Sequence, residues 1–156
     1  MQRHGPLLLL AFSATALGGA LLAEHVFGLM PCILCLYQRV PFAIIILLSL
    51  LAMLPGFARF RRPIIGLSGL IFLGGAAVAA FHTGVERKWW QGTSGCGVTG
   101  GAKTIEELLR QIEAAPVVRC DTIPWELFGL SMANYNVAYS LILGVAFLLL
   151  ANQKTK

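Results

Sequence analysis

Four long apolar runs constrain the fold of this chain more than any other feature of its sequence. They cover residues 6–27, 40–55, 64–82 and 135–151. A helix needs about 20 apolar residues to cross the hydrocarbon core of a bilayer, and the second run reaches that length only if residues 32–39 extend it. Pro41 would then kink this helix or mark its turn at the water side. The sequence therefore predicts an all-α membrane protein, a single domain of four transmembrane helices over residues 1–156.

The composition agrees with a chain that lies mostly in lipid. Of its 156 residues, 57% are hydrophobic and 12% are charged, whereas a soluble domain carries about 25% charged residues. Arg3 followed by an apolar stretch is also the pattern of a cleaved signal peptide, but the run is long for one. Within the runs, glycines are expected to let helices approach closely. These are Gly18, Gly19, Gly74 and Gly75.

Basic residues predict how the helices are oriented. They flank the runs on one side without any acidic residue among them, at Arg3, Arg59, Arg61, Arg62, Lys154 and Lys156. The positive-inside rule then places both termini and the 59–62 turn in the cytoplasm, and two loops, about 28–39 and 83–134, outside. The net charge of +5 is mostly this topology signal. No basic patch with base-stacking elements indicates nucleic-acid binding.

All four cysteines fall in the two outer loops, where an oxidising compartment permits disulfides. Cys32 and Cys35 form a CxxC motif in the first loop, and Cys96 and Cys120 lie in the second. Three pairings are possible, and the residues alone do not choose among them. A CxxC at a membrane surface can exchange electrons with a lipid-soluble molecule and with a soluble thiol protein. Purely structural disulfides are the alternative, and we expect no metal, because zinc ligands usually come as two close pairs.

The CxxC motif has a third member at helical spacing. Cys32, Cys35 and Arg39 are at positions i, i+3 and i+7, so they share one face if this stretch is helical. Cys32 would lie near the helix N-terminus, where the helix dipole stabilises a thiolate. The planar guanidinium of Arg39 can hold a carbonyl oxygen or a thiolate, or simply anchor the helix at the interface. His82, at the outer end of the third run, could donate to a polar group of a ligand, and Glu24 is a weaker candidate.

The second outer loop contains a glycine-rich stretch and a predicted helix. Residues 93–101 are expected to be mobile and to present Cys96 with little steric cover. Thr104 and Glu107 form a capping box, followed by apolar residues at helical spacing at Ile105, Leu108, Leu109 and Ile112. This pattern predicts a short amphipathic helix that ends near Pro116 and lies on the membrane surface, or else packs on other loop residues. Three tryptophans are expected to anchor the membrane interface; they are Trp89, Trp90 and Trp125.

Taken together, these motifs resemble a known family. Residues 31–39, Pro-Cys-Ile-Leu-Cys-Leu-Tyr-Gln-Arg, resemble the signature of the DsbB/BdbC family of membrane thiol–quinone oxidoreductases. The stretches 25–26, 81–83 and 125–132 are similar to the ends of that family's first and third helices and the approach to its fourth. One departure is Gln38, where enterobacterial relatives carry Glu, so that Arg39 has no acid next to it in sequence. The second outer loop is also shorter.

The resemblance implies a function in electron transport at the bacterial inner membrane, in support of protein disulfide-bond formation and folding. A reduced DsbA-like thiol oxidase would donate electrons to a Cys96–Cys120 disulfide, most readily at Cys96. The Cys32–Cys35 pair would receive them through a bond with Cys120 and pass them to a quinone, either ubiquinone or menaquinone. Cys35 is implied as the thiolate that meets the quinone ring. Arg39 and His82 are implied to hold the quinone oxygens.

Two other functions remain open at this point. A vitamin K epoxide reductase-like protein also couples cysteine pairs to a quinone, but in that family the CxxC follows the loop cysteines, whereas here it precedes them. A non-catalytic membrane adaptor, with disulfides that only hold its loops together, belongs to another class. Redox cycling of quinone by the purified protein separates these alternatives.

Overall fold

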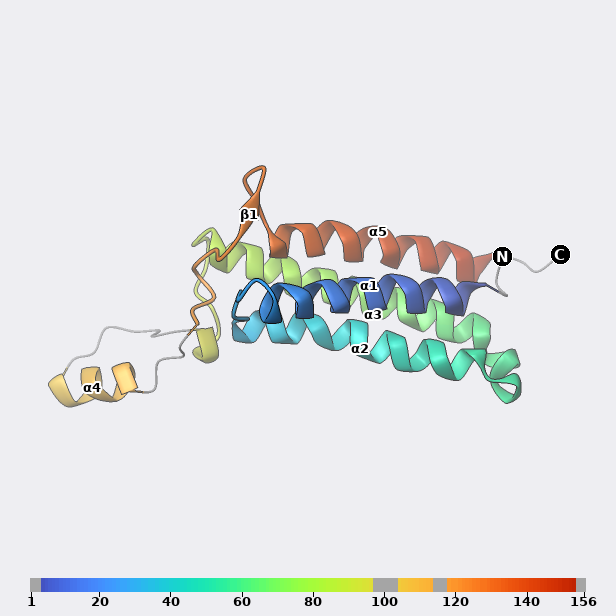
Figure 1. The fold of residues 1–156 in the computed structure, drawn as a ribbon, viewed down its shortest axis with the longest axis horizontal. Helices are drawn as coiled ribbons and strands as arrows, with labels where there is room; N and C mark the ends of the chain where they lie inside the picture. The colour runs from blue at the N-terminus through green and yellow to red at the C-terminus, as the bar shows by residue number, and fades with distance from the viewer. Residues whose placement is uncertain (1–3, 97–103, 114–117, 154–156) are drawn as a thin grey trace.

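Four long helices lie side by side and alternate in direction (Figure 1). The computed structural model describes residues 4–96, 104–113 and 118–153. The long helices are α1 (Gly5–His25), α2 (Ile33–Met53), α3 (Arg61–Glu86) and α5 (Met132–Asn152). Within the described residues, these four are long and apolar enough to cross a membrane. The structure thus confirms the all-α, four-helix membrane fold.

Two helices extend further toward the cysteine-bearing end than their apolar runs predict. Helix α2 begins at Ile33, with Cys32 as its N-cap and Pro41 inside it, so residues 33–39 extend the second apolar run as its length required. Helix α3 continues to Glu86, past the expected end at residue 82. The added turns carry polar side chains that are buried in the bundle, such as Gln38 and Glu86. A count of apolar residues underestimates these helices because it assumes that polar residues mark their ends.

The bundle core is aromatic and aliphatic. The ring of Phe72 lies 5.9 Å from that of Phe42 and 6.0 Å from that of Phe147, centroid to centroid. Around them packs a cluster of buried residues that also contains Leu9, Ile45, Ile65, Leu143 and Leu150. The core therefore joins all four long helices.

Helices approach closely at glycines, but only one of these is among the four glycines expected from sequence. A Cβ added at Gly69 of α3 would lie 2.9 Å from Leu148 Cγ and 3.0 Å from the Gly144 carbonyl oxygen of α5. Among the expected glycines, Gly75 packs tightly, since its added Cβ would lie 3.3 Å from Pro41 Cγ. The expectation was wrong for the others, which have nothing within 4 Å of an added Cβ: Gly18, Gly19 and Gly74.

Short elements occupy both ends of the bundle (Figure 1). The 3-10 helix η1 (Pro55–Phe60) joins α2 to α3 at one end. At the other end lie η2 (Ser94–Cys96), α4 (Ile105–Glu113) and a hairpin of β1 (Glu126–Leu127) and β2 (Leu130–Ser131). The Glu107 N–H donates to Thr104 Oγ1 at 3.2 Å, as expected for the start of α4. Most of the glycine-rich stretch, and the predicted helix stop near Pro116, lie outside the described residues.

The β1–β2 hairpin was not predicted from sequence. Its strands pair antiparallel, with Glu126 opposite Ser131. The turn places Phe128 and Gly129 at positive φ, 52° and 72°, a conformation typical of two-residue hairpin turns. The glycine was the available signal, but Phe in the left-handed region is unusual. Ser131 then caps α5 in a capping box with Asn134.

Candidate redox site

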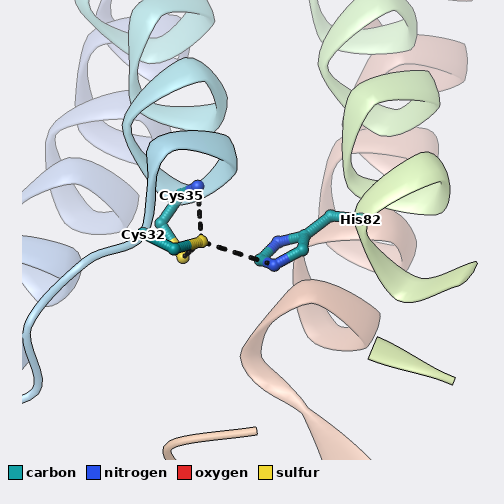
Figure 2. A group of neighbouring side chains, drawn as sticks. All are labelled: Cys32, Cys35 and His82. Carbon is teal, nitrogen blue, oxygen red and sulfur yellow. Dashed lines mark hydrogen bonds between the residues drawn. The ribbon is translucent and has the colours of Figure 1, made fainter. Parts of the chain in front are cut away.

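The CxxC motif occupies the first turn of α2. The Cys32 and Cys35 sulfurs are separate thiols, 3.1 Å apart, and face His82 on α3 (Figure 2). Cys32 is 4% exposed, and Cys35 is partly buried. The two cysteines of the motif therefore lie together at the start of α2, and α3 supplies a polar group beside them.

Cys32 is held as a thiolate. Its sulfur accepts the Cys35 backbone N–H at 3.4 Å and lies 3.5 Å from His82 Nε2. The hydrogen bond from the Cys35 thiol, together with the weaker effect of His82, outweighs burial and lowers the pKa of Cys32 from 9.0 to about 4. Its position as N-cap also favours the anion. The expectation that this cysteine is stabilised as a thiolate agrees with the geometry.

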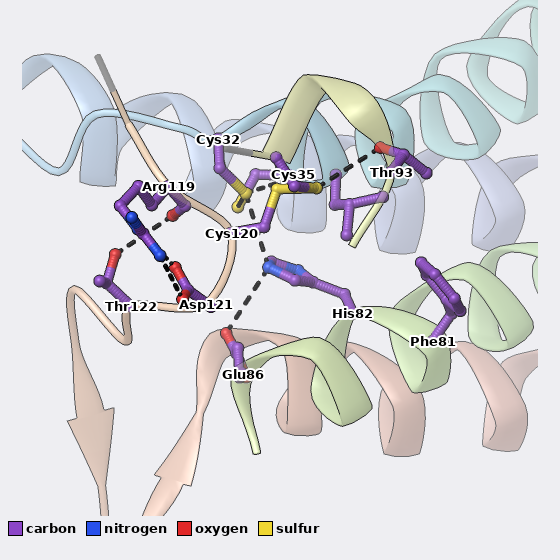
Figure 3. Close-up of a disulfide and its surroundings, with 12 residues drawn as sticks. Cys32, Cys35, Phe81, His82, Glu86, Thr93, Arg119, Cys120, Asp121 and Thr122 are labelled. Carbon is purple, nitrogen blue, oxygen red and sulfur yellow. Dashed lines mark hydrogen bonds and ion pairs between the residues drawn. A yellow bond between two sulfur atoms is a disulfide. The ribbon is translucent and has the colours of Figure 1, made fainter. Parts of the chain in front are cut away.

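The other two cysteines form a disulfide beside the first pair. Cys96 and Cys120 are bonded, and Figure 3 shows this disulfide beside Cys32 and Cys35. Both bonded cysteines belong to the buried cluster that contains Cys32, Leu34 and Val85. The Cys120 N–H also donates to the Cys96 carbonyl at 3.2 Å. The structure thus contains the Cys96–Cys120 disulfide implied by the resemblance and leaves Cys32 and Cys35 unbonded.

Cys96 is not open to solvent as the sequence suggested. It is 5% exposed, and Cys120 is fully buried. The 3-10 helix η2 packs against the start of α2, since a Cβ added at Gly95 would lie 3.3 Å from Ile33 Cγ2. A Cβ added at Gly92 would lie 2.6 Å from Cys96 Cβ. Gly92 and Gly95 therefore allow close packing rather than exposure, and the expectation of little steric cover was wrong.

An ion pair holds the turn that carries Cys120. Arg119 donates to both carboxylate oxygens of Asp121, at 2.8 and 2.7 Å (Figure 3). The Thr122 hydroxyl donates to the Arg119 carbonyl at 3.1 Å. The bidentate bond from Arg119 lowers the pKa of Asp121. Asp121 thus remains ionised, and the turn beside Cys120 stays ordered.

A buried polar network surrounds His82. Gln38 Nε2 lies 2.8 Å from His82 Nδ1, and Gln38 Oε1 accepts from Asn136 at 2.7 Å. On the Nε2 side, Glu86 Oε1 lies 3.8 Å away, and the Ser131 hydroxyl donates to this carboxylate. Sequence reasoning missed these partners. The available signals were Glu86 at i+4 from His82 and Gln38 at i+3 from Cys35.

Arg39 has an acidic partner after all, but on another helix. Its guanidinium donates to the Glu24 carboxylate of α1 and, at 3.4 Å, to the Ala20 carbonyl. The acid that is missing beside Arg39 in sequence is thus supplied in space. Glu24 was only a weak candidate because sequence does not pair the end of one helix with the first turns of the next.

A cavity of about 420 Å³ lies among the long helices. Its lining is mainly apolar but includes Cys35, Arg39 and His82, the three residues that the resemblance assigned to a quinone. Gln38, Glu86 and Asn136 also reach it. Such a cavity suits a largely apolar molecule with a few polar groups. Cys35 lines it and Cys32 does not.

The chain is similar over almost its whole length to proteins of one kind. Residues 2–150 match the family model described as disulfide bond formation protein DsbB. Disulfide bond formation protein B of Methylobacillus flagellatus is 30% identical, over 97% of this chain and 94% of the relative. Disulfide bond formation protein B 1 of Pseudomonas aeruginosa is 33% identical, over 91% and 88%. No solved structure matches significantly.

Proposed function

The chain belongs to the DsbB family of disulfide bond formation proteins, and we propose that it oxidises a DsbA-like thiol oxidase at the expense of a membrane quinone. One observation carries this proposal. A dithiol and a disulfide are buried in one cluster, and one sulfur of the dithiol lines a largely apolar cavity. A pair that only held loops together would have no need of a thiolate or of that cavity.

Electrons enter at the loop disulfide. A thiolate of the reduced partner attacks Cys96, forms a mixed disulfide with it, and releases Cys120 as a thiolate. The partner's second thiolate then displaces Cys96, so that the partner leaves oxidised and Cys96 and Cys120 remain as a dithiol. Because Cys96 is 5% exposed, the η2 segment must move before the partner can approach along the S–S axis.

The second exchange passes the electrons to the CxxC pair. Cys120 attacks Cys32 of an oxidised Cys32–Cys35 bond, and Cys96 then resolves the inter-loop disulfide. The burial of Cys32 and Cys120 in one cluster supports this route. The structure has the loop pair as a disulfide and the CxxC as a dithiol, which corresponds to the state after this transfer. The thiolate character of Cys32 supports the same order, because it stabilises the reduced pair.

The cavity residues fit a quinone. A quinone is mostly apolar, with two ring carbonyls, and the lining supplies apolar walls together with Arg39 and His82 as donors. When bound, it accepts two electrons and two protons. Arg39, oriented by Glu24, would donate to one carbonyl oxygen, and His82 to a polar group near Cys35. Ubiquinone and menaquinone both offer such carbonyls.

We place the cysteine-bearing end of this multi-pass bacterial membrane protein in the periplasm, with both termini in the cytoplasm. The support is that Arg59, Arg61 and Arg62 lie at the opposite end of the bundle (Figure 1), where the positive-inside rule expects them. A membrane-impermeant thiol reagent, applied to spheroplasts after reduction, should label the cysteines from outside. Labelling only after the membrane is permeabilised would contradict this orientation.

A coupled assay with the full-length protein in detergent micelles tests the function. We expect one quinone to be reduced for each disulfide formed in a reduced DsbA-like partner, over many turnovers. Quinone is followed by its ultraviolet absorbance and the partner by thiol titration. Denatured protein and a variant with all four cysteines changed to Ala are the controls.

Each outcome distinguishes the alternatives. If neither quinone nor partner changes, the chain is an adaptor with structural disulfides. Quinone reduction by small dithiols, without use of a DsbA-like partner, would favour a reductase of the vitamin K epoxide reductase type. Only coupled, stoichiometric turnover supports the proposal.

A further inference from the structure

A directed chain of hydrogen bonds runs from the interior of the bundle to His82. Gln38 Nε2 lies 3.2 Å from the Leu34 carbonyl oxygen and 2.8 Å from His82 Nδ1. A carbonyl oxygen only accepts hydrogen bonds, so the amide nitrogen of Gln38, not its oxygen, must face Leu34. The same nitrogen has a second hydrogen, which points at the His82 ring. Gln38 is 7% exposed, so little water competes for these bonds.

Two further hydrogen bonds, on the other side of Gln38, fix the same orientation of its amide group. Gln38 Oε1 accepts from Asn136 Nδ2 at 2.7 Å, and Asn136 Oδ1 accepts from the Ser140 hydroxyl at 2.9 Å. Each donor thus points toward His82. Turning the Gln38 amide over would place oxygen against oxygen at Leu34, and turning the Asn136 amide over would place oxygen against oxygen at Gln38.

We infer that Gln38 is a positioning residue that fixes the tautomer of His82. Because Nδ1 accepts the bond from Gln38, the neutral ring carries its proton on Nε2. That nitrogen faces the Cys32 sulfur at 3.5 Å (Figure 2) and Glu86 at 3.8 Å. The Nε2–H is therefore aimed at the Cys32 thiolate even though Gln38 touches neither cysteine sulfur.

Two consequences follow for the site. If the proposed function holds, the Nε2–H of His82 stabilises the thiolate of the reduced CxxC pair and stays on the cysteine side throughout the cycle.

The same tautomer also bears on metal binding. Cys32, Cys35 and His82 have ligand atoms within 4.8 Å of one another, but a protonated Nε2 has no lone pair for a metal ion. A metal could bind only after the Gln38 bond is broken.

Nitrogen-15 NMR of the reduced full-length protein in micelles, with ring-labelled histidine, tests the tautomer directly. Protonated and bare ring nitrogens have well-separated shifts, and His82→Asn identifies the His82 signals by their loss. We expect a protonated Nε2 and a bare Nδ1 in the wild type. In Gln38→Met, which keeps the side-chain size but has no donor, the proton should redistribute between the two nitrogens. Gln91→Met, at an exposed glutamine, should leave the spectrum unchanged.

The wild-type spectrum alone can overturn the inference, so the test remains decisive even if the Gln38→Met variant does not fold. A proton on Nδ1 of wild-type His82 contradicts it, as does a fixed Nε2–H in Gln38→Met. Gln38→Glu gives a second variant, whose carboxylate accepts rather than donates, and should move the proton onto Nδ1. Neither quinone nor partner is present in this measurement. A result that contradicts the inferred tautomer is therefore distinguishable from a result that contradicts the proposed function.

Discussion

Two residues of the candidate site, Cys32 and Arg39, each have a partner on another helix. Cys32 is a thiolate because Cys35 and His82 donate to its sulfur. Arg39 is held beside the cavity by Glu24 of α1. Both residues could be proposed from the CxxC motif and the helical spacing that follows it. Their partners on other helices, His82 and Glu24, could not be paired with them from sequence alone.

The pKa of Cys32 predicts a pH titration. In a Cys96→Ala, Cys120→Ala background, the reduced protein should show one thiolate by ultraviolet absorbance at neutral pH, lost as the pH falls through about 4. A lowered pKa means that the native state favours the thiolate. This stabilisation is complete above the ordinary thiol pKa of 9.0 and declines toward pH 4. Cys35→Ala removes the main donor and should raise the midpoint. A thiolate that appears only near pH 9 in the parent would contradict the account.

Arg39 should control quinone use rather than exchange with the partner. A charge-assisted hydrogen bond contributes about 1.5–3 kcal/mol, so Arg39→Ala should raise the KM for quinone by about 10- to 100-fold. Lys should restore only part of this loss, because it keeps the charge but not the planar fork. Steady-state kinetics with varied quinone measure the effect. Arg59→Ala, at the opposite end of the bundle, is the control. An unchanged KM for quinone in Arg39→Ala would contradict a quinone-binding role and leave Arg39 with only its structural ion pair to Glu24.

At the scale of elements, the sequence predicted the long apolar helices and α4, but it missed the last turn of α3 and the burial of Cys96. The four apolar runs found the bundle, and the Thr104 capping box found α4. The first turns of α2 were anticipated, because the second run needed residues 32–39 to reach span length. The last turn of α3 was missed, because the polar residue Glu86 faces the interior. Cys96 was expected to be exposed, since it lies in a glycine-rich stretch, but Gly95 instead allows η2 to pack against Ile33.

The contact between α3 and α5 should depend on Gly69. Its added Cβ would lie within 3.1 Å of the backbone of α5, which cannot move as a side chain can, so Gly69→Ala should cost about 1–3 kcal/mol. Gly74→Ala on the same helix meets nothing within 4 Å and should be neutral or stabilising by up to about 1 kcal/mol. Thermal unfolding in one detergent compares the two. Equal or higher stability of Gly69→Ala would refute the close contact.

The η2 segment should be the place where the partner attacks. Cys120 is fully buried, whereas Cys96 lies in a single 3-10 turn at 5% exposure. A DsbA-like partner that lacks its resolving cysteine should therefore be trapped as a mixed disulfide with Cys96. Non-reducing peptide mapping identifies the bonded cysteine. An adduct mainly on Cys120 or Cys32 would show that attack occurs elsewhere.

At the scale of the whole molecule, the bundle brings together cysteines that are far apart in sequence. Cys120 is 24 residues from its disulfide partner, yet both lie in the cluster that contains Cys32. Hydropathy and charge indicated only that all four cysteines share one side. The pairing was implied by the resemblance, and the burial of both pairs in one cluster emerged only from the structure. That arrangement is what the proposed function requires for two linked disulfide exchanges.

The central claim is that the two pairs act in series, and single-turnover thiol titration of two variants tests it most directly. Cys32→Ser should still oxidise one equivalent of partner through Cys96–Cys120 but reduce no quinone. Cys96→Ser should oxidise no partner, while its Cys32–Cys35 pair, once reduced by a small dithiol, should still reduce quinone. Both results together are what a series relay predicts. Sustained oxidation of the partner by Cys96→Ser, coupled to quinone, would contradict it.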